Sequence, residues 1–276
     1  MATPAVLAPR NVHTTLNYFT VDGNEAPYNY VESPPEGTPR TNIKEDVRPA
    51  VIHDTRGQED TVGLDKTGFK FVRHVSSEKE FLDEEAIKTR YYQEVEALLK
   101  KETGAKRVFI FDHTIRRNYD ANTPMSRGPV KRVHVDQTYT ASVARVHYHL
   151  GDDADRLLKS RVRIINVWRP IGNIVAHNPL AVADFYSLDR ENDLVSTRHI
   201  YPTREGATFS VRYNPKHQWY FLADQTPEEV TLIKCFDSDE DKARLTPHTA
   251  FVDPTSPESA PDRQSIEVRA LVFDSE

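Results

Sequence analysis

Two residues separated by one position, His134 and Asp136, form the pattern in this chain that is best suited to metal chemistry. They lie in the segment KRVHVDQTY at 131–139, whose β-branched and aromatic composition predicts a strand. Because side chains alternate along a strand, the imidazole and the carboxylate would point to the same face. One further histidine would complete a set of two histidines and one carboxylate, which holds Fe(II) and leaves adjacent coordination positions open. Taken alone, His-x-Asp is also typical of a surface strand with two polar residues.

The third ligand is expected from a later strand that folds back beside the first, and His248 is the best candidate. It stands in LTPHTAFVDP, where Pro247 and Pro254 bracket a short extended piece. His147 and His149 fall in a segment predicted to be helical, where a two-residue spacing sends the rings apart. Three more histidines fit less well, because they lie in a loop, at a strand end or after a turn: His177, His199 and His217.

An arginine and a serine, Arg263 and Ser265, open the last predicted strand and share one face of it. A guanidinium binds a carboxylate through two parallel hydrogen bonds, to which the hydroxyl can add a third. The pair would suit the distal carboxylate of 2-oxoglutarate, whose keto-acid end would chelate the iron. Arg269 is a rival with the same strand parity, but it lies roughly 20 Å further along an extended strand. Only one of the two arginines is therefore expected to contact this small anion.

The composition excludes several functional classes. The formal net charge is −6 and acids and bases are mixed along the chain, so no basic surface for nucleic acid is indicated. Cys235, the only cysteine, leaves no intrachain disulfide, favours a reducing compartment and is interpreted as a core residue. No signal peptide or membrane-spanning segment is recognisable. We expect a cytoplasmic protein without membrane contact, and the oligomeric state, a homodimer included, is left open.

The first part of the chain is predicted to be an arm and a helix. Residues 21–66 are rich in proline, Pro49 among them, and are expected to form a long irregular arm on the surface. A helix is predicted at 78–102, with Ser76 or Ser77 as its N-cap and Gly104 marking its end. We expect it to pack on the outside of a sheet through apolar residues at helical spacing: Ile87, Tyr91, Val95, Leu98 and Leu99.

From residue 107 onward, short β-branched and aromatic runs separated by turn formers predict the strands of a sandwich or barrel. One helical interruption is predicted at about 140–159. The simplest description is one mainly β (α+β) domain over 1–276, with the arm and helix in 1–104 and the metal-bearing core in 105–276. The predicted strands are 107–113, 131–139, 161–168, 194–201, 207–213, 217–222, 230–236 and 264–273.

The order His-x-Asp, later His, then Arg-x-Ser resembles the Fe(II)/2-oxoglutarate-dependent oxygenases with a double-stranded β-helix (jelly-roll) core. More specifically, the chain resembles the fungal hydroxylase/desaturase family typified by the aspergillic acid pathway enzyme and the gibberellin GA4 desaturase. The supporting stretches span nearly the whole chain: NYF at 17–19, FDHTIRR at 111–117, HVDQT at 134–138, NVWRPI at 166–171, NPLAVAD at 178–184, WYFLADQTPEE at 219–229, IKCFDS at 233–238, TPHTAFVDP at 246–254 and RQSIEVRALVF at 263–273.

The resemblance implies a jelly-roll core with flanking helices, and an enzyme that uses Fe(II), 2-oxoglutarate and O2. It carries His134, Asp136 and His248 over as iron ligands, and Arg263 with Ser265 as the anchor of the cosubstrate. The substrate would be a small specialised metabolite or an amino-acid-derived molecule. The outcome at its unactivated C–H bond would be hydroxylation, desaturation or oxidative cyclisation such as aziridine formation.

Seven further residues on the expected jelly-roll strands are candidates for lining the substrate pocket: Arg116, Arg117, Gln137, Tyr139, Asn166, Trp168 and Arg169. Arg169 is favoured for a carboxylate-bearing substrate, because it closes a predicted strand near the expected barrel mouth. An ion-pair role for Arg169 and a core role for Trp168 remain alternatives. Two other functions are also carried: a metal-dependent, cupin-like isomerase without O2, and an accessory jelly-roll subunit, since the resembled family is related to a cephamycin methoxylation component.

Overall fold

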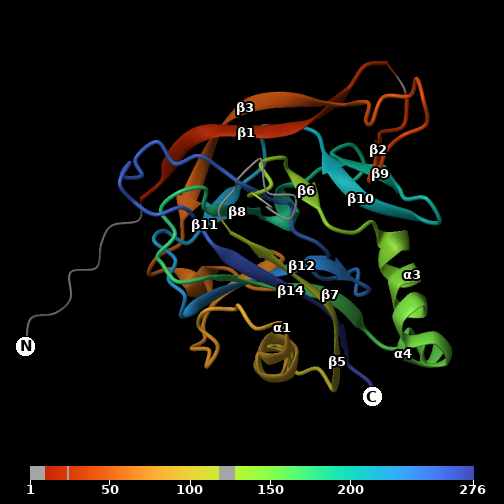
Figure 1. Ribbon diagram of the computed structural model, residues 1–276, viewed down its shortest axis with the longest axis vertical. Coiled ribbons are helices and arrows are strands. Elements are labelled where there is room, and N and C mark those ends of the chain that lie inside the picture. The colour runs from red at the N-terminus through yellow and green to blue at the C-terminus, as the bar shows by residue number, and fades with distance from the viewer. Residues whose placement is uncertain (1–9, 24, 118–127) are drawn as a thin grey trace, which may run out of the picture.

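The computed structural model describes residues 10–23, 25–117 and 128–276, which form two facing β-sheets (Figure 1). The larger, sheet A, has nine strands in the described part of the chain, in the spatial order β1 (Val12–Val21), β3 (Ile43–Asp54), β11 (Trp219–Phe221), β8 (Leu180–Ala183), β13 (His248–Ala250), β6 (His134–Val135), β10 (Glu205–Val211), β9 (Leu194–Ile200) and β2 (Tyr28–Tyr30). The smaller, sheet B, has the order β4 (Phe69–Arg73), β12 (Glu229–Asp237), β7 (Val162–Pro170), β14 (Ser265–Phe273) and β5 (Arg107–Arg116). The mainly β fold predicted from the sequence is confirmed.

The hydrophobic core fills the space between the two sheets. Val182 of sheet A and Trp168 and Ile233 of sheet B belong to one buried cluster there. A second cluster lies on the outer face of sheet B. Strand β7 contributes to both, with Ile164 in the inner cluster and Ile165 in the outer one, because successive side chains point to opposite faces. Sheet B is therefore buried on both sides.

The outer face of sheet B is covered by the helix expected at 78–102, which lies below that sheet in Figure 1. It begins with α1 (Glu84–Ala86), passes through a π-helical turn, η2 (Ile87–Tyr91), and continues as α2 (Tyr92–Thr103). Its predicted apolar stripe is buried and its end at Gly104 is confirmed, with a left-handed φ of 71°. The predicted caps are wrong: the Asp83 carboxylate caps the first turn, whereas Ser76 and Ser77 donate hydrogen bonds to Glu94.

The N-terminal region contributes strands rather than only an arm. Strands β1 and β3 pair antiparallel along their length, from Val12 opposite Ile52 to Val21 opposite Ile43. The prediction of an irregular arm over 21–66 is wrong for this stretch. Pro49 is tolerated because β11 pairs only with residues 52–54, so that β3 has a single neighbouring strand around the proline.

The segment that follows Asp136 turns into a helix at once. Only His134–Val135 of the predicted strand 131–139 is a strand, and Thr138 caps α3 (Tyr139–Leu150) by accepting a hydrogen bond from the Ala141 N–H. The helical interruption continues as η3 (Gly151–Asp153) and α4 (Ala154–Leu157), and two other short turns are η1 (Glu59–Thr61) and η4 (Phe185–Ser187). No helix in the described ranges is long and apolar enough to cross a membrane.

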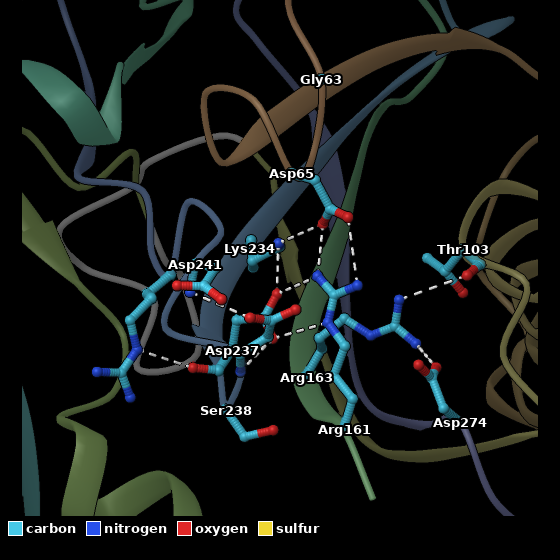
Figure 2. Close-up of polar contacts among 12 residues, drawn as sticks. Gly63, Asp65, Thr103, Arg161, Arg163, Lys234, Asp237, Ser238, Asp241 and Asp274 are labelled. Atoms are coloured by element: carbon cyan, nitrogen blue, oxygen red, sulfur yellow. Dashed lines mark hydrogen bonds and ion pairs between the residues drawn. The ribbon is translucent and has the colours of Figure 1, made fainter.

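A network of charged groups ties sheet B to the turn that precedes β4 (Figure 2). Lys234 and Asp237 of β12 are fully buried, and the Lys234 ammonium lies 2.6 Å from Asp237 and 2.9 Å from Asp65. Arg161, just before β7, binds both carboxylates, at 2.6 Å each. Because two cations share two carboxylates, the removal of either acid leaves both cations, of which Lys234 is fully buried, with a single carboxylate.

Replacement of Asp237 should therefore destabilise the fold strongly. Asp237→Ala is expected to lower the free energy of unfolding by about 3–5 kcal/mol, because Lys234 stays buried with one carboxylate fewer. Urea unfolding followed by circular dichroism measures this loss. Glu240→Ala, which removes an exposed partner of Arg244, is the control and should change the unfolding midpoint little. Equal midpoints for the two variants would contradict the prediction.

Candidate active site

The two histidines and the aspartate selected from the sequence meet between the sheets. His134 on β6 and His248 on β13 are direct partners in sheet A, with ring centroids 4.4 Å apart. The Asp136 Oδ1 atom lies 3.3 Å from Nε2 of His134 and 3.8 Å from Nε2 of His248. One ligand atom from each residue falls within 4.8 Å of the others, and no other such group of His, Cys, Asp or Glu occurs among the described residues. The expected convergence is thus present.

Both imidazoles are oriented by backbone carbonyls. The Nδ1 of His134 lies 2.8 Å from the Arg132 carbonyl oxygen, and the Nδ1 of His248 lies 3.0 Å from that of Thr246. A carbonyl only accepts, so each Nδ1 must carry the proton, which leaves the Nε2 lone pairs facing Asp136. Burial, and then the charge of His134, lowers the pKa of His248 and favours the neutral ring. This donor set fits a divalent metal such as Fe(II).

Residues of sheet B hold the second carboxylate oxygen of Asp136, Oδ2. Its Oδ2 accepts hydrogen bonds from the Asn166 amide at 2.8 Å and from Nε of Arg269 at 3.1 Å. Glu267 in turn lies 2.7 Å from Arg269 and accepts a bond from Asn166. Burial alone would raise the pKa of the Asp136 carboxyl, but Arg269 and the histidines hold it well below its usual value. The carboxylate is therefore ionised, with Oδ1 left to face the histidines.

The position of His248 depends on a close backbone contact. Gly68 has a φ of 98°, and a Cβ atom there would lie 2.5 Å from the Thr246 hydroxyl and 2.8 Å from the Leu245 carbonyl oxygen. Only glycine fits both the conformation and the space. Since the Thr246 carbonyl orients His248, Gly68 sets how closely that segment approaches sheet B.

A narrow cavity with an open volume of about 360 Å³ adjoins the three residues and contains a buried arginine. Arg263 lines it, lies 5.4 Å from the ring of Trp168 and donates one hydrogen bond to the Asn178 carbonyl. Its Nε has no partner among the described residues, and burial lowers the pKa of the guanidinium to about 9. Arg116 also lines this cavity. A desolvated cation of this kind fits a small anionic ligand.

A second and much larger cavity, with an open volume of about 1760 Å³, lies on the other side of Asp136. Asp136 and Arg269 line both cavities, whereas His134 and His248 line only the narrow one, so the group of three faces the narrow cavity and adjoins the large one through Asp136. One face of α3 forms a wall of the large cavity, and the turn between β9 and β10 contributes another part. The two adjoining cavities can therefore hold a small anion and a larger molecule, both within reach of Asp136.

The structure places Arg169 away from both cavities. Its guanidinium lies in the outer cluster of sheet B, where it binds the Tyr91 hydroxyl and the carbonyls of His74 and Pro227. Trp168, its neighbour, faces the narrow cavity. Strand alternation accounts for the difference, because adjacent residues of β7 point to opposite faces. The prediction that Arg169 lies at a barrel mouth is therefore wrong. Arg169 also forms no ion pair with a described residue, because its hydrogen-bond partners are neutral acceptors.

Two other candidates lie beside the cavities rather than in their described linings. Tyr139 packs against Phe209 and under the guanidinium of Arg244. Ser265 is buried on β14, on the same face as Glu267 and Arg269. As expected from the sequence, alternate residues of the last strand share one face. The same face carries Glu267, which was not predicted to belong to the site.

Four other histidines considered from the sequence lie outside the group of three. His217 is buried between Tyr18 and Asp193 and contacts both. His199 accepts or donates a bond with Thr208 in the wall of the large cavity. His149 stacks on Phe111, whereas His147 lies near Asp155. Cys235 is buried in the inner cluster, as expected, and burial raises the pKa of its thiol.

Similarity to known proteins agrees with this geometry. A family described as an oxidoreductase/YMDC permease-like domain matches residues 16–273. The chain is 36% identical to the hydroxylase/desaturase efuI of Hormonema carpetanum, over 98% of this chain and 97% of that protein. It is 32% identical to the Fe(II)/2-oxoglutarate-dependent dioxygenase nvfI of Aspergillus novofumigatus, over 88% and 90%. A solved structure of the iron and alpha-ketoglutarate-dependent endoperoxidase NvfI matches with a TM-score of 0.87 and 31% identity, over 96% and 99%. The predicted jelly-roll core is confirmed.

The amide of Asn166 should be needed for tight metal binding. Asn166→Ala is expected to weaken Fe(II) affinity about 10–100-fold, because Oδ2 of Asp136 loses one of the two donors that fix the carboxylate. Anaerobic competition with a chromophoric chelator measures the dissociation constant. Asn173→Ala, in an exposed turn, serves as the control. An unchanged affinity in Asn166→Ala would show that Arg269 alone suffices.

Proposed function

Because the chain belongs to the hydroxylase/desaturase family of Fe(II)/2-oxoglutarate-dependent dioxygenases, we propose that His134, Asp136 and His248 hold the iron with which it oxidises a small specialised metabolite or amino-acid-derived substrate. The observation that carries this proposal is the convergence of two Nε2 atoms and one carboxylate oxygen at the narrow cavity, with Asp136 also lining the large one. The reaction would take place at an unactivated C–H bond. Its outcome would be hydroxylation, desaturation or oxidative cyclisation.

When bound, Fe(II) and 2-oxoglutarate would supply, together with O2, an oxidant strong enough to attack such a bond. The protein's residues do the positioning. His134, His248 and Oδ1 of Asp136 would hold the metal through three atoms, and its remaining coordination positions would be available for ligands. The large cavity would orient the substrate and keep the reacting carbon near the metal. The narrow cavity would exclude water from the cosubstrate.

Arg263 is the proposed anchor of the cosubstrate, with Ser265 as the helper expected from the sequence. Arg263 lines the narrow cavity and has an unpartnered Nε among the described residues. The rival, Arg269, lies within ion-pair distance of Asp136, Asp112 and Glu267. An arginine shared by three carboxylates has little capacity left for a fourth. These contacts favour Arg263 for 2-oxoglutarate and a supporting role for Arg269.

Replacement of Arg263 and replacement of Arg269 should therefore weaken the binding of different ligands. Arg263→Leu is expected to weaken 2-oxoglutarate binding about 30-fold or more and to leave metal affinity nearly unchanged, because it removes only the anion's partner. Arg269→Leu is expected to weaken metal affinity first, because Asp136 loses a donor. Calorimetric titrations of metal, then of 2-oxoglutarate, separate the two. The opposite pattern would assign the anchor to Arg269.

The activity is tested by cosubstrate turnover. Protein loaded with Fe(II) under nitrogen should release succinate from 2-oxoglutarate when air is admitted, whereas Asp136→Ala should bind no iron and release none. Circular dichroism should show that this variant keeps its fold. Iron binding without succinate release, with the true substrate present, would favour the isomerase. A folded wild-type protein that binds no iron would favour the accessory subunit.

A further inference from the structure

The charged groups that line the large cavity are unequally paired. Its described lining contains three carboxylates, and each of them has an arginine partner. Asp112 and Asp136 are bound by Arg269, and Glu205 is bound by Arg198. The guanidinium groups of the other two lining arginines, Arg145 and Arg204, have no hydrogen bond or ion pair with a described residue. The cavity therefore has positive charge to spare next to the metal position.

Arg145 is the more enclosed of these two. It lies on α3, the helix that begins three residues after Asp136, and its guanidinium is 4.7 Å from the centroid of the Phe111 ring. Its Nε is buried without a partner, whereas Arg204 is an exposed residue stacked on Tyr201. Burial is the largest cause that lowers the pKa of Arg145. A half-buried cation that has no carboxylate within ion-pair distance among the described residues favours a ligand that supplies one.

The surroundings of Arg145 are largely apolar. Ala141, Ala144 and Tyr148 line the cavity from the same face of α3, and Phe111 covers one face of the guanidinium. The aromatic face of Phe111 leaves the edge of the guanidinium available for a planar, two-pronged acceptor. A ligand with an apolar body and one terminal carboxylate would match both parts of this wall.

We propose that Arg145 is a specificity-determining residue that binds a carboxylate group of the substrate in the large cavity. The inference rests on the proposed function, because it assigns the large cavity to the substrate. It also changes where a substrate carboxylate would be recognised: Arg169 is bound to neutral acceptors behind sheet B, whereas Arg145 faces the cavity. The carboxylate would hold the substrate at α3 and direct the rest of the molecule toward Asp136.

The test compares acids with their neutral amides. Wild-type protein is loaded with Zn(II), which supports no turnover, and with saturating 2-oxoglutarate, so that the narrow cavity is filled. Phenylacetate, 3-phenylpropanoate, 4-phenylbutanoate and hexanoate are then titrated by calorimetry, each beside its primary amide. At least one acid is expected to bind about tenfold or more tightly than its amide. Arg145→Gln should abolish this preference and Arg145→Lys should retain part of it.

Arg156→Gln, on the surface of α4, is the matched control and should keep the full preference. The inference is overturned if no acid is preferred by the wild type, or if the preference survives in Arg145→Gln. The same titrations report Zn(II) and 2-oxoglutarate binding. If these fail in the wild type, the proposed function itself fails; if they succeed and the acid preference is missing, only the role of Arg145 is lost.

Discussion

The site depends on one carboxylate whose two oxygens face different sheets. Oδ2 of Asp136 accepts hydrogen bonds from Asn166 and Arg269, both on sheet B, whereas Oδ1 faces the two histidines of sheet A. Without the bonds from sheet B, a carboxylate just beyond the end of β6 could rotate and present either oxygen. With them, it is ionised and fixed, and the distance between the sheets sets the geometry of the donor atoms.

The arginines around the site differ in whether they have acidic partners. Arg269 is saturated with carboxylates and belongs to the scaffold, whereas Arg263 and Arg145 are desolvated and lack an acidic partner among the described residues. These two lie in different cavities that share Asp136 in their walls. Because each cavity contains an arginine without an acidic partner, the two cavities can bind two anionic groups at once, one in each.

The sequence predicted the parts of the structure that follow local periodicity. The His134–Asp136 pair, the long helix and most strands after residue 107 were found, because alternation and helical spacing are properties of short segments, whereas β4 and β8 were not predicted. Arg169 was misplaced although Trp168 stood beside it, and strict alternation allows only one of the two to face a cavity. The β1–β3 pair was missed because pairing between distant segments, not composition, makes Pro49 compatible with a strand. Asn166 and Glu267 act through Asp136, a relation that only the folded chain reveals.

Gly68 carries no functional group and lies far along the chain from His134, Asp136 and His248. Because it has no side chain, Thr246, whose carbonyl orients His248, can approach it closely. Sequence evolution of such a site would therefore be constrained at a position that lines neither cavity. A saturation survey scored by catalysis would count this glycine among the essential positions, although its contribution is the absence of atoms.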